Sequence, residues 1–97
     1  MFRYVVLTTF TDQGIRNAKD TVKRADAARE AAKRFGVNMR ELYWTQGQYD
    51  LVALCEAEDE NAAVTFALAL GSGGNVRGQT LRAFSRDEMS AIVAKLP

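Results

Sequence analysis

The residues with the clearest chemical potential lie in one short turn, Gly47-Gln48-Tyr49-Asp50. A phenol and a carboxylate are adjacent there, and the glycine supplies the backbone freedom that a tight turn needs. Tyr49 and Asp50 are the catalytic candidates, because a nearby cation could lower the pKa of the phenol from its usual value of about 10. The alternative is structural: Asp50 bonds the backbone of the turn, and Tyr49 packs over a hairpin.

Cations and amides from two other segments are candidates for the same site. Arg16, Asn17 and Lys19 stand at a predicted helix start, where free backbone N–H groups help to hold an anion. The whole set predicts a site for a small polar or anionic ligand, formed by Arg16, Asn17, Lys19, Tyr49, Asp50, Asn75 and Arg77. The alternative is a solvated surface, on which Arg16 or Lys19 pairs with Asp12 or Asp50.

Several kinds of chemistry are excluded by residue type. The chain has no histidine and one cysteine, Cys55, which rules out histidine-based triads and structural zinc sites. No run of Asp and Asn resembles a calcium loop, and Gly71–Gly74 follows a predicted helix, whereas phosphate-binding loops precede one. We therefore expect no cofactor and no bound metal, and we expect Cys55 to be an inert core thiol.

Length and charge narrow the class of protein further. A chain of 97 residues forms one domain, residues 1–97, and 47% hydrophobic residues are typical of a globular protein. With 13 basic and 12 acidic side chains there is no electrostatic footprint for nucleic acid or an anionic membrane. The sequence begins with a strand-like run and has no long apolar stretch, so we expect a cytoplasmic protein.

The hydrophobic pattern predicts four strands, of which the first and third are apolar on both alternating faces and so belong in the centre of a sheet. Asp12–Gly36 has an apolar residue at every third or fourth position, as in a helix that ends at Gly36. This helix divides near Thr21, whose hydroxyl could cap the second part. The expected strands are Phe2–Phe10, Val37–Gln46, Leu51–Cys55 and Asn75–Phe84.

Two further helices are predicted. Asp59 is a suitable N-cap for a helix over Glu60–Leu70 that stops at Gly71. A short closing helix over Arg86–Lys95 has its apolar side, expected to point inward, at Met89, Ile92 and Val93.

The order βαββαβ with a terminal helix predicts an α+β, ferredoxin-like fold with a four-stranded antiparallel sheet. Both crossover helices cover one face of such a sheet, so its other apolar face has no cover within the chain. A second copy would bury that face, which predicts a homodimer or higher oligomer akin to the dimeric α/β barrels. Trp44 is expected to pack at the interface or line a pocket, and Arg82 is expected to point toward the dimer face.

Several segments spread over nearly the whole chain form one set: Gly14-Ile15-Arg16-Asn17, Lys19-Asp20, Lys23-Arg24-Ala25, Tyr43-Trp44-Thr45, Gly47-Gln48-Tyr49-Asp50, Gly74-Asn75-Val76-Arg77 and Thr80-Leu81-Arg82-Ala83-Phe84. With this set the chain resembles the GYD domain family. The family is named for a Gly-x-Tyr-Asp turn, here Gly47, Tyr49 and Asp50. The resemblance implies a bacterial protein with a ferredoxin-like fold akin to dimeric α/β barrels, and it implies no settled biochemical activity.

Three functions are open at this point. The first is a non-enzymatic, oligomeric binding or regulatory module with a ligand at the rim, the end of the predicted sheet that carries Tyr49 and Asp50. The second is a cofactor-independent enzyme that acts on a small organic acid or phenol, with Tyr49 and Asp50 as acid and base and with Arg16 and Lys19 orienting the substrate. The third is a purely structural assembly protein, in which the rim is another assembly surface.

Overall fold

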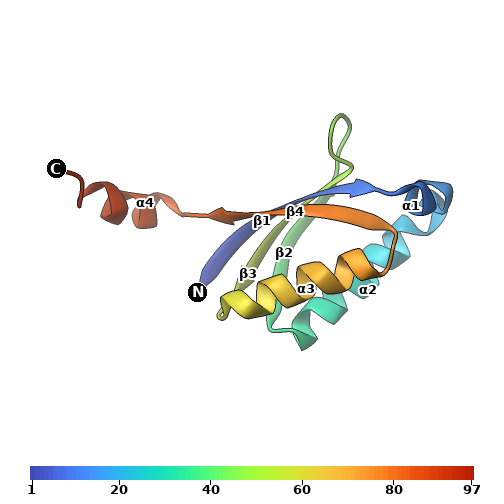
Figure 1. The fold of residues 1–97 in the computed structure, drawn as a ribbon, viewed down its shortest axis with the longest axis horizontal. Helices are drawn as coiled ribbons and strands as arrows, with labels where there is room; N and C mark the ends of the chain where they lie inside the picture. Colours follow the sequence, from blue (N-terminus) through green and yellow to red (C-terminus); the bar gives the residue numbers. More distant parts are fainter.

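The computed structural model describes residues 1–97 and has the predicted element order (Figure 1). Its strands form one antiparallel sheet in the order β2-β3-β1-β4, so the two strands that are apolar on both faces are central, as predicted. The α+β, ferredoxin-like fold is confirmed. The elements are β1 (Phe2–Phe10), α1 (Asp12–Arg16), the short 3-10 helix η1 (Ala18–Asp20), α2 (Thr21–Arg34), β2 (Val37–Trp44), β3 (Leu51–Ala57), α3 (Glu60–Ser72), β4 (Val76–Ala83) and α4 (Arg86–Val93).

Helices α2 and α3 lie on the same side of the sheet, and the loop between β2 and β3 projects on the opposite side (Figure 1). The core lies between these helices and the sheet, where Phe35 and Phe66 have ring centroids 6.0 Å apart. We call this side the covered face. Its buried cluster consists of Tyr4, Ala32, Val37, Met39, Ala53, Cys55, Ala57, Ala63 and Phe66.

The opposite side of the sheet, which we call the open face, has an apolar centre that no element of the chain covers. Leu54 and Leu81 both lie opposite Val5 in the strand register and keep 38% and 39% exposure. Side chains directly opposite in neighbouring strands share one face of the sheet. The apolar centre of the open face consists of Val5, Leu7, Val52, Leu54 and Leu81.

The predicted division of the first helical segment is confirmed, because α2 begins at Thr21 after the short turn η1. The predicted cap is wrong: the hydroxyl of Thr21 accepts a hydrogen bond from Trp44 Nε1 at 3.0 Å, and α2 has no side-chain cap. Asp59 caps α3 as predicted by accepting from Asn61 N at 3.0 Å. However, α3 continues through Gly71 to Ser72, so Gly71 does not end it.

The closing helix α4 does not pack inward. It extends away from the body of the molecule (Figure 1), and Met89, Ile92 and Val93 remain 43%, 44% and 48% exposed, so the inward position predicted for them is wrong. Its first turn is held by a capping box of Ser85 and Glu88, and Glu88 Oε1 lies 2.6 Å from Arg3 Nη1. None of the helices has the length and apolar composition that crossing a bilayer requires.

Arg82 is also placed differently from the prediction. It pairs in register with the buried Tyr4, and its guanidinium carbon lies 5.0 Å from the ring centroid of Phe2 and 4.3 Å from that of Phe84. Arg82 therefore lies on the covered side of the sheet and does not point toward the open face. Its Nη2 is 4.0 Å from Glu88 Oε2.

Candidate functional site

Asp50 fastens the beginning of β3 to the end of β1. Its backbone N donates to Thr8 O at 2.8 Å, and its carboxylate Oδ2 accepts from Phe10 N at 2.8 Å. The structural interpretation expects a bond to the backbone, but the partner belongs to a neighbouring strand and not to the turn itself. The carboxylate satisfies a backbone N–H at the end of a strand, where a buried orphan donor would be destabilising.

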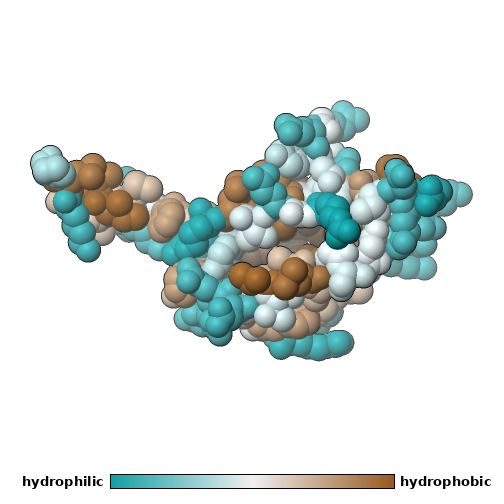
Figure 2. All heavy atoms as spheres, in the orientation of Figure 1, coloured by the Kyte–Doolittle hydropathy of each residue, from teal (hydrophilic) through white to brown (hydrophobic).

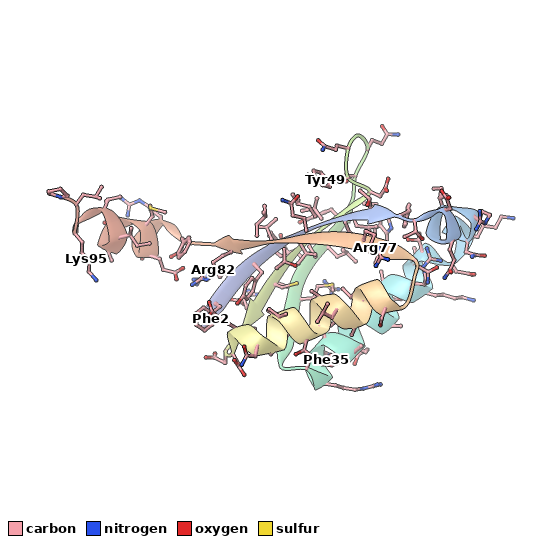
Figure 3. The ribbon with its side chains drawn as sticks, viewed as in Figure 1. Phe2, Phe35, Tyr49, Arg77, Arg82 and Lys95 are labelled. Atoms are coloured by element: carbon pink, nitrogen blue, oxygen red, sulfur yellow. The ribbon has the colours of Figure 1, made fainter.

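Tyr49 lies on the other side of the same turn. Its hydroxyl lies 3.4 Å from Gln79 Oε1, and Gln79 is in register with Leu7 of the open face. Tyr49 is on the side of the sheet away from Phe35 (Figure 3). The turn is closed by Thr45, whose hydroxyl donates to Tyr49 O at 2.7 Å and whose N donates to Asp50 O at 2.8 Å. The phenol and the carboxylate are therefore adjacent in sequence but engaged with different partners.

Arg16, Asn17 and Lys19 lie at the junction of α1 and η1, and all three are exposed. Asn17 Nδ2 donates to Gln13 O at 2.9 Å, which ties the last turn of α1. Arg16 and Lys19 take part in no ion pair, so the pairing with Asp12 or Asp50 considered above does not occur.

Asn75 is packed against the start of α1. Its backbone O accepts from Thr11 N at 3.1 Å, and its side-chain Oδ1 accepts from Gln13 Nε2 at 3.0 Å. A Cβ atom at Gly14 would collide with the carbonyl group of Asn75, so this close approach requires glycine. Arg77 bends back to α3, where its Nη1 donates to Gly71 O at 3.3 Å. The topology thus brings the predicted segments to one end of the sheet, which we call the rim.

A pocket of about 350 Å³ lies between the sheet and helices α2 and α3, and we call it the interlayer pocket. Figure 2 shows the surface hollowed between α3 and the edge strand β4. Of the predicted site residues only Asn75 lines the pocket; Tyr49 and Asp50 do not. Apolar side chains form most of its wall, and its polar lining side chains are those of Thr8, Thr21, Arg24 and Asn75.

The pocket exists because α2 presents alanines to the sheet. Ala25, Ala28 and Ala31 line it from the helix, and Ala53 lines it from the centre of the sheet. Protein interiors are normally packed with few voids larger than a water molecule, so small side chains on both sides leave an unfilled volume. The alanine stripe is visible in the sequence, but there it indicates only the buried side of a helix.

Arg24 is the pocket residue that sequence reasoning missed. Its Nη1 donates to Asn17 O at 2.6 Å and its Nη2 donates to Gly14 O at 3.2 Å, so a residue that lines the pocket also ties α2 to α1. A signal was available: Arg24 lies four positions before Ala28, on the same side of the helix.

Cys55 lies in the wall of the pocket and in the buried core. Burial raises the pKa of its thiol to about 11, and Arg29 opposes this only in part. The thiol therefore stays protonated near neutral pH, which disfavours a nucleophilic role because the thiolate is the reactive form. The expectation that Cys55 is part of the core is confirmed.

Comparison with known proteins decides the family. The sequence model of the GYD domain matches residues 4–93. The chain belongs to the GYD domain family. This GYD domain is 35% identical, over 94 residues and 96% of each chain, to the "Glutamine synthetase and cystathionine beta-lyase binding protein" of Thermus thermophilus. It is also similar to the crystal structure of a protein from Thermus thermophilus, with a TM-score of 0.56 and 28% identity over 88% of this chain and 95% of the other.

Proposed function

We propose that this GYD domain is a non-enzymatic binding module that forms a homo-oligomer through its open face and binds a partner enzyme. The observation that carries the proposal is the uncovered apolar centre of the open face. Apolar patches of this kind are typical of surfaces that bind another protein. The most economical cover is a second copy, because a two-fold axis places the same patch on both partners.

The size of the chain supports self-association. Only 12 of its 97 residues are buried. All of the buried residues in the strands face the covered side of the sheet. Small domains bury too little surface for high stability by themselves, so oligomerisation is a common way to add buried area. Leu54, on a central strand, would move from 38% exposure into such an interface.

The partner enzyme is proposed from the relative's name. A protein that is 35% identical over 96% of its length binds glutamine synthetase and cystathionine beta-lyase according to that name. We propose that this chain binds an enzyme of one of these two classes. Assembly through the open face would favour binding of an enzyme, because an oligomer presents its remaining surfaces in several copies and several copies bind more tightly than one.

The bonding of Asp50 supports a binding module over an acid–base enzyme. Asp50 Oδ2 accepts from Phe10 N and the Asp50 backbone N donates to Thr8 O, so the residue has a structural role that accounts for it without catalysis. Tyr49 faces Gln79 on the other side of the turn. We propose instead that the rim takes a small polar or anionic ligand, with Asn75 at the interlayer pocket and with Arg16, Lys19 and Arg77 as exposed cations.

The test measures both parts of the proposal. Sedimentation velocity at micromolar concentration should show a dimer or a larger oligomer, and a monomer would contradict the assembly. Biolayer interferometry with immobilised chain should then detect purified glutamine synthetase or cystathionine beta-lyase from the organism that encodes this chain. An unrelated enzyme of similar net charge is the control, and binding of neither candidate would contradict the partner.

A further inference from the structure

We propose that the interlayer pocket binds a small amphipathic anion, with an apolar body among the alanines of α2 and a carboxylate at Arg24. The proposal deepens the small-molecule part of the function proposed above. It rests neither on the partner enzyme nor on the oligomer. The pocket proposal can therefore fail while the assembly and partner proposals stand, and the reverse.

The volume and lining of the pocket select the body of the ligand. About 350 Å³ lies at the small end of the range of roughly 300–1,000 Å³ that is usual for small-molecule sites. Most of the wall is aliphatic or aromatic, with Ala28, Leu42 and Phe66 on three different elements. Apolar walls of this kind favour a molecule that brings hydrocarbon out of water, such as a medium-length alkyl chain.

Arg24 selects the head group, because it is the only charged residue that lines the pocket. Two of its N–H groups are engaged with backbone oxygens of Asn17 and Gly14, which fix the guanidinium in place. A guanidinium has five donors in a planar fork, so donors remain for a carboxylate. A single cation in an otherwise uncharged pocket favours an anion over a neutral or cationic ligand.

The position of the head group follows from the other polar wall residues. Thr21 and Asn75 line the pocket together with Arg24. Asn75 bonds Gln13 and Arg24 bonds Asn17, so these polar residues lie at the rim end of the pocket. The carboxylate therefore lies toward the rim and the hydrocarbon lies under α2 and α3. Thr21 also accepts from the indole of Trp44, the only tryptophan of the chain, so Trp44 fluorescence is a natural reporter of occupancy.

The first experiment compares octanoate with octanol, which share an alkyl chain and differ in charge. Titration followed by Trp44 fluorescence and calorimetry should show saturable binding of octanoate, and weaker binding of octanol. Arg24→Gln should weaken octanoate about tenfold, as expected for loss of a charge-assisted hydrogen bond, and leave octanol unchanged. Lys23→Gln is the matched control, because Lys23 is exposed on the same helix and does not line the pocket.

The second experiment fills the pocket. Ala28→Leu should abolish binding of both octanoate and octanol without lowering the melting temperature, since the added side chain occupies space that is already present. Asp26→Leu adds the same side chain at an exposed position of α2 outside the pocket and should leave binding unchanged.

Three results would overturn the proposal: no saturable binding of octanoate by the unaltered chain, an equal loss of octanoate and octanol in Arg24→Gln, or full binding in Ala28→Leu. Sedimentation velocity of the same samples reports the oligomer separately. A chain that assembles but binds no octanoate contradicts this inference alone, and a monomer that binds octanoate contradicts the assembly alone.

Discussion

The two faces of the sheet are completed in different ways. The covered face lies beneath two helices, but alanines of α2 leave a pocket of about 350 Å³ there. The open face carries apolar side chains, Leu7, Leu54 and Leu81 among them, and has no cover within the chain. Small helix side chains over the covered face thus leave an unfilled volume, whereas the open face leaves apolar side chains exposed to solvent.

The largest effect is expected in the core of the covered face. Phe66 is 4% exposed and packs against Phe35, so Phe66→Ala should lower the free energy of unfolding by about 3–5 kcal/mol. Leu68→Ala on the same helix is the control; Leu68 is 70% exposed, and the change should be within about 0.5 kcal/mol. Urea denaturation measures both. Equal values for the two variants would show that the covered face does not hold the fold together.

A charge on the open face should break assembly without affecting the other face. Leu54→Glu would place an unpaired carboxylate in the proposed interface, and we expect self-association to weaken at least about a hundredfold, or roughly 3 kcal/mol. Val64→Glu is the control, because Val64 is 60% exposed on α3. Sedimentation velocity measures the dissociation constant of each. If Leu54→Glu assembles like the control, the open face is not the interface.

A moderate effect is expected at Asp50, which ties β3 to β1 at the rim. Removing the carboxylate in Asp50→Ala leaves Phe10 N without its acceptor and should lower the free energy of unfolding by about 1–3 kcal/mol. Asp50→Asn keeps a carbonyl oxygen at the same position and should recover most of this loss. Thermal denaturation distinguishes the two. Unchanged stability in Asp50→Ala would contradict the role of this carboxylate in tying β3 to β1.

The smallest effect concerns α4, which belongs to neither face. The backbone N–H of Ser85, with Arg3 and Arg82 nearby, holds the pKa of Glu88 below its ordinary value of 4.5. A lowered pKa in the folded state stabilises the ionised form, so this contribution is present above pH 4.5 and is lost as the pH falls through the lowered pKa.

An NMR titration of the Ser85 and Glu88 amide signals should therefore show α4 loosening from the sheet in this acid range. Glu88→Gln should remove that transition and leave the rest of the titration unchanged. A transition of the same size in Glu88→Gln would mean that another carboxylate controls the attachment of α4.

Much of the fold follows from local patterns in the sequence. The two-sided hydrophobicity of Phe2–Phe10 predicts a central strand, and Thr21 and Asp59 mark true helix starts. The wrong predictions concern which part of the molecule packs against a given helix or strand. The inward position predicted for Met89 and Ile92 of α4 is wrong, because periodicity does not show whether any other element faces the apolar side of a helix.

The site is less accessible to sequence reasoning, for a similar reason. Topology alone places the Tyr49/Asp50 turn at the same end as Asn75, and the structure agrees. The interlayer pocket, however, depends on the volume left between α2 and the sheet, which is a tertiary quantity. Arg24 was overlooked because an arginine on a helix is usually solvated, and its bonds to Asn17 and Gly14 depend on the turn before α2.

Native mass spectrometry of the purified chain with added octanoate would show in one spectrum whether one face of the sheet binds a second copy while the other holds a small molecule. We expect a dimer or larger oligomer that takes up one octanoate per chain, in the unaltered protein and in Val64→Glu alike. A monomer that takes up no octanoate would contradict both assignments.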